Sequence, residues 1–288
     1  MKTTDLLKKV RKIEIKTRGL SKQIFAGEYH SAFKGKGMTF SEVREYQYGD
    51  AIKGIDWNVT ARFNHPYVKV FEEERELTVM LLIDVSASKI FGTHIQLKKE
   101  LITEIAAVLS FSAIANNDKI GVIFFSDKIE RYIPPKKGKK HILRIIRDLI
   151  EFKPENKGTD IALALQYYTN VIKKRSTAFI ISDFIDQDFE KSLQIANNKH
   201  DIIALRIFDQ RERELPDVGL LYLSDAENND KKWIDTSSKK IRNQYAEWWR
   251  KNSQELQKTF SKNGIDNIDL ETGKDYVKSL IGLFKKRA

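Results

Sequence analysis

Five oxygen-bearing side chains stand at the ends of apolar, strand-like runs or on the loops that follow them. Two are aspartates, Asp84 after the run TVMLLI and Asp183 after AFIIS, and the other three are hydroxyls. In an open sheet of parallel strands, ligands bind beyond the carboxyl ends of the strands. Carboxylates and hydroxyls suit Mg²⁺, Mn²⁺ or Ca²⁺ and do not suit zinc. We therefore expect one divalent-cation site, made of Asp84, Ser86, Ser88, Thr159 and Asp183.

The expected site has few carboxylates for a divalent ion. Mg²⁺ keeps water molecules when a protein supplies few ligands, and neutral hydroxyls leave the ion electrophilic. A carboxylate from another molecule could complete its shell, which predicts binding and not catalysis. The competing interpretation is structural, because each of these Asp, Ser and Thr residues could simply cap a helix.

The elements that must position these residues follow a regular pattern from residue 78 onward. The continuous run TVMLLIDV is typical of a strand buried on both faces, and KIERYIPP ends in two prolines, which suits an edge strand. Strands that alternate with helices indicate an α/β fold, with a mostly parallel sheet and helices on both faces. The expected strands are 78–85, 119–126, 128–135, 178–183, 201–208 and 264–272, and the expected helices are 93–116, 138–151, 159–173, 188–198, 238–262 and 273–286.

Two regions differ in pattern. Residues 1–76 hold a predicted amphipathic helix, 3–19, and then a glycine- and aromatic-rich stretch that predicts a small, irregular β-containing subdomain. Residues 77–288 form the α/β domain with a C-terminal helical extension. Within it, 220–226 and 232–236 read as a late hairpin. Trp248 and Trp249 are adjacent, so we expect one in the core and the other exposed.

The pattern Asp-x-Ser-x-Ser, followed by a distant Gly-Thr-Asp and a distant Ser-Asp, resembles the metal-ion-dependent adhesion site of von Willebrand factor A domains. The resemblance covers about residues 77–210. It implies a Rossmann-type fold in which Ser86 and Ser88 bind the metal directly. It also implies that Thr159 and Asp183 bind the metal directly or through water.

A second resemblance covers the segment before this domain and is the most specific one in the chain. It is to the bacterial domain of unknown function 58 family. The resemblance implies a von Willebrand factor A-like protein that assists a MoxR-like AAA+ ATPase in maturing or remodelling other proteins. The matching residues are Gly35, Gly37, Phe40, Arg44, Tyr46, Gly49, Asp50, Ile55, Asp56, Trp57, Ala61 and Arg62.

The same segment, 35–62, allows two interpretations. Its aromatic, acidic and arginine side chains could form a docking surface for a partner. They could also form a structural clasp that orders the loop-rich subdomain, with Arg44 and Arg62 paired to Asp50 and Asp56 around Trp57. We favour the clasp, because a buried tryptophan and paired charges are usually structural.

Composition limits the remaining possibilities. The chain has 288 residues, a net charge of +11 and no cysteine, so disulfides and thiolate metal sites are excluded. It begins without a signal-like segment and has no apolar run long enough to cross a bilayer, so we expect a cytoplasmic protein. Three basic clusters, at 136–140, 173–175 and 285–287, make nucleic acid a second hypothesis. We favour solvated surface instead, because no aromatic recognition signature accompanies them.

The function expected from these observations is metal-dependent protein–protein interaction, as an adaptor or co-chaperone-like partner of a MoxR-like AAA+ ATPase or its client. The alternative is a metal-dependent hydrolase or phosphatase that uses the same ion to polarise its substrate. We expect no enzyme, since the five histidines are scattered and the sequence has no Gly-x-Ser-x-Gly motif or visible general base.

Overall fold

The computed structural model describes residues 39–72, 77–86, 97–154, 158–224 and 231–287. The chain divides into two compact units. The smaller unit is Lys34–Leu77, and the larger unit consists of Met1–Phe33 and Thr78–Ala288. The predicted helix 3–19, the glycines Gly35 and Gly37, and Ser88 lie outside the described residues.

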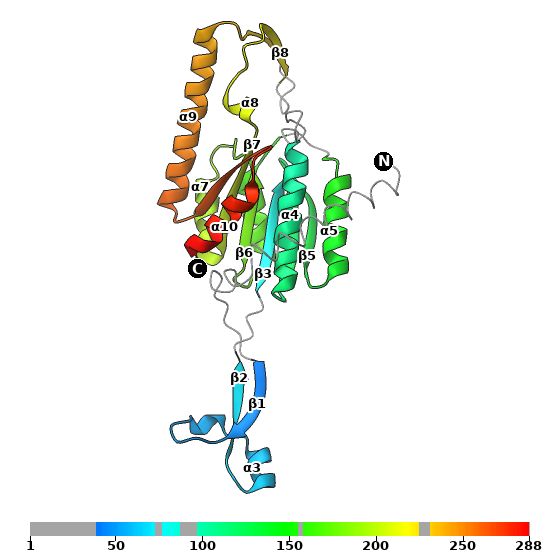
Figure 1. The fold of residues 1–288 in the computed structure, drawn as a ribbon, viewed down its shortest axis with the longest axis vertical. Coiled ribbons are helices and arrows are strands. Elements are labelled where there is room, and N and C mark those ends of the chain that lie inside the picture. Colours follow the sequence, from blue (N-terminus) through cyan, green and yellow to red (C-terminus); the bar gives the residue numbers. More distant parts are fainter. Residues whose placement is uncertain (1–38, 73–76, 87–96, 155–157, 225–230, 288) are drawn as a thin grey trace. The chain divides into compact units, whose positions relative to one another are not determined.

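A six-stranded sheet forms the centre of the larger unit (Figure 1). Its strand order is β10-β7-β6-β3-β4-β5, and all neighbours are parallel except β4 and β5. The proline-containing strand is therefore the antiparallel edge, as its sequence predicts. The strands are β3 (Thr78–Asp84), β4 (Lys119–Phe125), β5 (Ile129–Lys136), β6 (Thr177–Ser182), β7 (Asp201–Phe208) and β10 (Asp266–Glu271).

Helices cover both faces of this sheet, because its central strands are apolar on both sides. Alternate strand residues, Met80 and Leu82 among them, share one buried cluster with α6 (Ile161–Val171), α7 (Glu190–Lys199) and the end of α9 (Lys239–Lys262). On the opposite face, Phe179 contacts Phe284 of α10. The covering helices are α4 (Lys98–Ala115), α5 (Lys139–Glu151), α6 (Ile161–Val171), α7 (Glu190–Lys199) and α10 (Tyr276–Arg287). The predicted α/β architecture is confirmed.

An insertion separates the last two strands of the sheet. It consists of α8 (Gln210–Arg213), the antiparallel pair β8 (Leu220–Ser224) and β9 (Lys231–Asp235), and the long helix α9 (Lys239–Lys262). The predicted hairpin and helix are both present. Figure 1 shows the hairpin and the first turns of α9 rising beyond the carboxyl edge of the sheet. On α9, Trp249 is buried against Phe208 and Trp248 is half exposed, as expected for adjacent residues. The ring of Tyr245 neighbours the exposed Trp248.

The smaller unit pairs β1 (Thr39–Glu45) with β2 (Tyr67–Glu72) and adds a short turn of 3₁₀ helix, η1 (Ile52–Gly54), and α3 (Trp57–Phe63). Polar contacts hold it together. Arg44 donates two hydrogen bonds to Asp50, at 2.8 and 2.7 Å. Asp56 caps α3 by accepting from the backbone N–H groups of Asn58 and Val59.

Part of the clasp interpretation is wrong in this unit. Trp57 is 67% exposed, and Arg62 is exposed with no ion pair among the described residues. Asp56 pairs with Lys69 instead of an arginine. Among the side chains that the structure describes here, only Val68 is a buried apolar residue. The Arg44–Asp50 pair is the part of the expected network that forms.

Candidate metal centre at the carboxyl edge of the sheet

The strand order reverses at β3, which has β4 on one side and β6 on the other. Such a reversal separates the loops that leave neighbouring strands and opens a crevice where α/β proteins bind ligands. Asp84 is the last residue of β3, and Asp183 follows the last residue of β6. The topology therefore brings both predicted aspartates to the reversal point.

The Asp84 carboxylate is buried and accepts two short hydrogen bonds. Its Oδ1 accepts from the backbone N–H of Ser86 at 2.9 Å, which turns the chain just after β3. Its Oδ2 accepts from the hydroxyl of Ser182, the last residue of β6, at 2.6 Å. Because both contacts fix the carboxylate, Asp84 and Ser86 are held at the junction of the two strands.

Thr159 reaches the same edge through its neighbours in sequence. The backbone N–H of Asp160 donates to the carbonyl of Ser126, just beyond β4, at 2.9 Å. The N–H of Ile161 donates to the carboxylate of Asp186, in the loop after β6, at 2.8 Å. These two bonds tie the turn that carries Thr159 to loops on both sides of β3. The fold thus brings Asp84, Ser86, Thr159 and Asp183 to one edge, and Ser88 lies outside the described residues.

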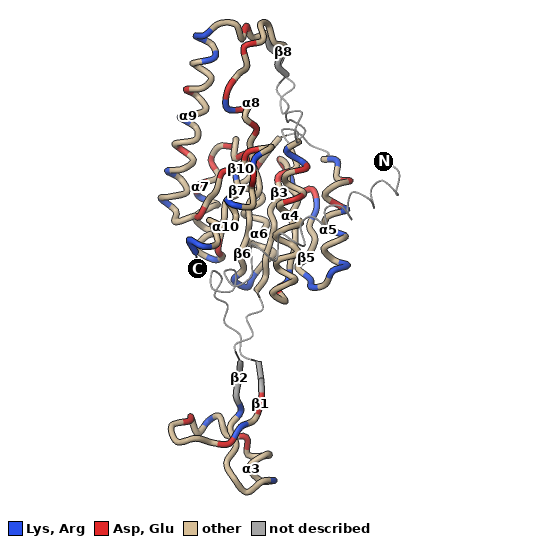
Figure 2. Tube along the Cα trace, viewed as in Figure 1, with Lys and Arg blue, Asp and Glu red and all other residues tan. Residues whose placement is uncertain are grey.

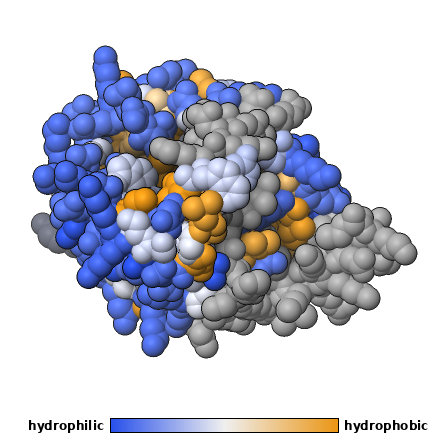
Figure 3. Space-filling model, turned by 90° about the horizontal axis from the view of Figure 1, so that it is seen from above, coloured by the Kyte–Doolittle hydropathy of each residue, from blue (hydrophilic) through white to orange (hydrophobic). Residues whose placement is uncertain are grey.

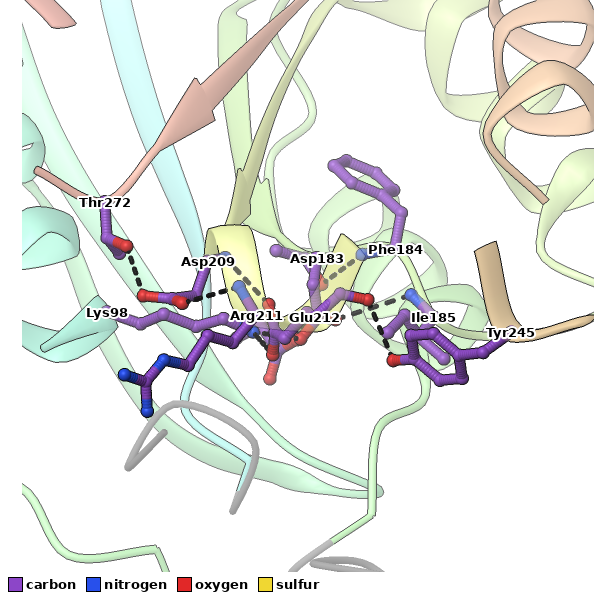
Figure 4. A network of polar contacts seen from close by, with 11 residues as sticks. Lys98, Asp183, Phe184, Ile185, Asp209, Arg211, Glu212, Tyr245 and Thr272 are labelled. Carbon is purple, nitrogen blue, oxygen red and sulfur yellow. Dashed lines mark hydrogen bonds and ion pairs between the residues drawn. The ribbon is translucent and has the colours of Figure 1, made fainter. Parts of the chain in front are cut away.

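Asp183 has a partner that its sequence context does not predict (Figure 4). Lys98, the first residue of α4, has a side chain with no solvent exposure, and its Nζ donates to Asp183 Oδ2 at 3.1 Å. The residue after Asp183, Phe184, has φ of 57°, which is uncommon for a bulky side chain. Strained backbone of this kind clusters at functional sites, and here it shapes the turn beside Asp183.

Lys98 also pairs with Glu212 of α8, so one ammonium joins two carboxylates from distant parts of the sequence. Burial raises the pKa of the Glu212 carboxyl, and the charge of Lys98 opposes that shift. Glu212 further accepts from the backbone N–H of Asp209, and its carbonyl accepts from the hydroxyl of Tyr245 on α9. The candidate centre is therefore connected to the insertion through Lys98 and Glu212.

Negative charge accumulates on the other side of the centre. Burial, followed by the charges of Asp160 and Asp84, raises the pKa of the Asp186 carboxyl, against two backbone hydrogen bonds that lower it. The parts of this shift that come from Asp160 and Asp84 show that these carboxylates lie close enough to Asp186 to repel its charge.

The donor set fits a hard divalent cation in chemistry, with one reservation about Asp183. Asp84 supplies a carboxylate, and Ser86 and Thr159 supply hydroxyls. One oxygen of Asp183 is already paired with the Lys98 ammonium, so Asp183 is partly neutralised from within the protein. Among the described residues, no three His, Cys, Asp or Glu side chains are grouped as a metal cluster. A cation here would rely on hydroxyls and on few carboxylates.

Several residues of this centre escape sequence reasoning. Lys98 lies in the sequence Leu-Lys-Lys-Glu, which is typical of an exposed helix, and nothing local indicates its burial. Glu212 lies even further from the motif. Ser182 and Asp186 flank Asp183 closely enough that the acidic, hydroxyl-rich stretch SDFID could have drawn attention to them.

One arrangement resembling a catalytic group lies elsewhere. Ser176 Oγ is 2.7 Å from the hydroxyl of Tyr168 and 3.2 Å from Nδ1 of His200. All three side chains are buried. Burial lowers the pKa of His200 to about 4, so its ring is neutral at pH 7. We interpret this group as core packing between α6 and the starts of β6 and β7.

The strand order, the helices on both faces and the position of Asp84 and Ser86 at the end of β3 define a von Willebrand factor A-like protein. An aerotolerance-related membrane protein from Bacteroides fragilis has a similar fold, with a TM-score of 0.50 and 14% identity over 73% of this chain and 99% of that one. The von Willebrand factor A domain of SpRpn10 is also similar, with a TM-score of 0.39 and 12% identity over 72% of this chain and 94% of its own.

The chain belongs to the family described as "Protein of unknown function DUF58", whose profile matches residues 42–255 and so includes parts of both units. The uncharacterized protein Rv1480 of Mycobacterium tuberculosis is 27% identical over 281 residues, covering 96% of this chain and 88% of the relative. YeaD of Bacillus subtilis, also uncharacterized, is 28% identical over 109 residues, covering 38% of this chain and 25% of YeaD. No described helix combines the length and apolar character that a membrane span requires.

Proposed function

We propose that this protein is a metal-dependent protein-interaction module that binds an acidic side chain of its partner through a divalent cation. The single observation that supports this best is the gathering of Asp84, Ser86, Thr159 and Asp183 at the point where the strand order reverses. The ion, Mg²⁺ or else Mn²⁺ or Ca²⁺, would be held by these residues together with Ser88. When bound, it would supply a Lewis-acidic position that a partner carboxylate could fill.

The chain's own residues contribute the rest of this function. The bonds from Ser182 and from the Ser86 backbone hold Asp84 in place, so its orientation does not depend on the ion. Lys98 neutralises part of Asp183 and keeps the total charge of the centre low. A cation with few carboxylate ligands remains attractive to an external carboxylate, which is the property that a binding centre needs.

A cation titration tests the metal site directly. Thermal unfolding with rising Mn²⁺ or Mg²⁺ should raise the Tm of the wild type by mass action, and Asp84→Ala should abolish the rise. Asp217→Ala, which removes an exposed carboxylate from the insertion, is the matched control and should keep the rise. Equal Tm shifts in wild type and Asp84→Ala would contradict the metal hypothesis.

The proposed partner is a MoxR-like AAA+ ATPase or its client, in the cytoplasm, and the proposed role is that of an adaptor or co-chaperone. Support for this comes from family membership and from the resemblance in residues 35–62. The experiment is a pull-down of the MoxR-like ATPase encoded in the same genome, with Mg²⁺ and with EDTA. We expect the ATPase to bind in the presence of Mg²⁺, and we expect both EDTA and Asp84→Ala to remove that binding. A complete lack of binding, with Mg²⁺ as well as with EDTA, would refute this partner.

We also propose that the centre binds and does not catalyse. The described residues around Asp84 are carboxylates, hydroxyls and a buried ammonium, and none is a histidine placed as a general base. Incubation with a panel of phosphoester substrates and Mg²⁺ should release no phosphate above the level of Asp84→Ala. Turnover that Asp84→Ala abolishes would establish the hydrolase alternative instead.

A further inference from the structure

Exposed apolar side chains concentrate at one end of the larger unit. Eight large apolar residues are exposed among its described residues, and seven of them lie at or beyond the carboxyl edge of the sheet. The exception is Ile195 on α7. Seen from above, apolar side chains gather near the middle of this end (Figure 3). Larger exposed apolar patches mark interaction sites. The seven are Leu97, Ile185, Val218, Leu220, Tyr222, Trp233 and Trp248.

The hairpin supplies most of this surface. Leu220 and Tyr222 are two residues apart on β8 and so share one face. Tyr222 lies directly opposite Trp233 of β9, with ring centroids 4.8 Å apart, and the two side chains are 51% and 62% exposed. We call Leu220, Tyr222 and Trp233, with Val218 just before them, the hairpin face.

The hairpin does not need this face for its own attachment to the unit. Its base is held by polar contacts: the Thr236 hydroxyl donates to the Gly219 carbonyl at 2.6 Å, and Arg242 of α9 pairs with Asp217 at 3.0 Å. Tyr245 of α9 then bonds to Glu212. An exposed aromatic pair that the hairpin does not need for its attachment is suited to contact a partner.

The charge at the base of the hairpin is positive. α9 begins with Lys239 and Lys240, both exposed, and has no acidic residue in its first turn. The positive end of the dipole of this long helix adds to them. Nearby, the Asp217 carboxylate is paired with Arg242, and Asp235 accepts from Ser237. The blue tube at the start of α9 in Figure 2 marks these cations.

Lys239 and Lys240 follow β9 closely along the chain and so belong to the base of the hairpin. The base is the end that the Tyr245–Glu212 contact connects to the candidate metal centre. An acidic partner is therefore favoured at the base, beside the hairpin face.

We propose that the hairpin face and the lysines at the start of α9 form a docking surface for an acidic protein segment with apolar or aromatic side chains. Its apolar side chains cover Tyr222 and Trp233, and its carboxylates face Lys239 and Lys240. This inference deepens the proposed function, on which it rests for the idea that a protein partner presents acidic groups here. The hairpin contact itself needs no metal ion.

The test is a selection from a random 12-residue peptide display library on the immobilised full chain. Selected peptides are then synthesised and measured by fluorescence anisotropy, with matched versions in which Asp and Glu are replaced by Asn and Gln. We expect enrichment of acidic and aromatic residues together, and weaker binding of the neutral versions. Enrichment of basic peptides, or of none, would overturn the proposal.

Variants locate the binding. Tyr222→Ser with Trp233→Ser should weaken the selected peptides by about tenfold or more, since aromatic anchors dominate such interfaces. Ile195→Ser removes another exposed apolar side chain, from α7, and should leave binding unchanged. Lys239→Glu with Lys240→Glu should weaken binding, and the control pair Lys251→Glu with Lys258→Glu on α9 should not. Peptides that bind the hairpin variant as tightly as wild type would refute the assigned surface.

Two further measurements separate this inference from its rivals. Sedimentation across a concentration series should show no self-association through the hairpin, and a dimer that Trp233→Ser dissociates would assign the face to a second copy and overturn the proposal. Peptide binding is then repeated with Asp84→Ala and with EDTA. Hairpin-dependent binding that persists in both upholds the docking surface even if the metal-dependent function fails. Metal-dependent binding that the hairpin variants leave unchanged supports the metal-dependent function and refutes the proposed docking surface.

Discussion

The two units of this chain stabilise themselves by different means. In the larger unit, central strands such as β3 and β6 bury almost every side chain, and helices seal both faces. In the smaller unit, Val68 is the one buried apolar residue among the described side chains, and Trp57 and Tyr48 are exposed. Its order rests on the Arg44–Asp50 pair and the Asp56 cap. Local polar contacts can define a conformation, but they bury little apolar surface.

The low burial in the smaller unit helps to decide whether segment 35–62 is a structural clasp or a docking surface. A clasp built around a buried tryptophan would have given the small unit a core, and Trp57 is not buried. The exposed aromatic residues of this segment are consistent with the docking interpretation. The following predictions test whether the two units differ in energetics as their burial suggests.

The largest effect should come from Lys98→Met. This change leaves the carboxylates of Asp183 and Glu212 without their buried cation, and breaking such a pair costs about 3–5 kcal/mol. Urea unfolding followed by far-UV circular dichroism measures the loss. Lys251→Met, at an exposed position of α9, is the control and should be close to neutral. A Lys98→Met protein as stable as wild type would show that the buried pairs do not hold the carboxyl edge together.

Two tryptophans give the next comparison. Trp249 is 7% exposed and packs against Phe208 and the Arg206 guanidinium. Trp249→Ala should therefore cost about 3 kcal/mol of unfolding free energy. Trp57→Ala, in the small unit, should change it by less than about 0.5 kcal/mol. Denaturant melts of both variants measure the difference, and a large loss from Trp57→Ala would restore the clasp.

Acid should weaken the larger unit before the smaller one. Burial, with help from Lys199 and Arg175, lowers the pKa of His200 from 6.5 to about 4. Because the folded protein binds this proton less readily than the unfolded chain does, the neutral His200 ring contributes to stability at pH values above 6.5. That contribution is lost as the pH falls from about 6.5 towards 4. In the smaller unit, Arg44 and the Gln47 backbone N–H lower the pKa of the Asp50 carboxyl from its ordinary value of 3.8. The contribution of Asp50 to stability is therefore lost only as the pH falls below 3.8.

NMR titration measures both transitions. The His200 ring should stay neutral to about pH 4 in the folded protein, and His200→Gln should flatten the pH dependence of stability between pH 6.5 and 4. A His200 ring that titrates near the ordinary value of 6.5 would show that its burial has been overstated.

The smallest effect should come from Arg44→Ala. Loss of the pair with Asp50 should speed amide hydrogen exchange in β1 and β2 and leave the exchange of β3 and β6 unchanged, because local contacts stabilise only their own unit. Arg62→Ala, which removes an exposed arginine from the same unit, is the control. If Arg44→Ala retained wild-type exchange but lost binding to the ATPase, the arginine would belong to a docking surface.

Much of the fold and half of the centre could be predicted from sequence. The apolar runs of β3 and β6, the prolines of the edge strand and the turn residues of the hairpin are local signals, and each predicts its element correctly. The Asp-x-Ser-x-Ser motif predicts which edge of the sheet carries the centre, because a residue that ends a parallel strand must lie at the carboxyl edge. Strand ends and hairpin turns are encoded by neighbouring residues, so they can be read without the rest of the chain.

Burial and pairing of individual charges were decided only by the tertiary structure. Lys98 and Trp57 illustrate this in opposite directions, since a lysine in a charged helix is fully buried and a tryptophan among aromatic and charged residues is exposed. Asp183 meets Lys98 across 85 residues of sequence, and Glu212 joins them from α8. A side chain's environment depends on every element that packs against it, and periodicity along one segment holds no information about those elements.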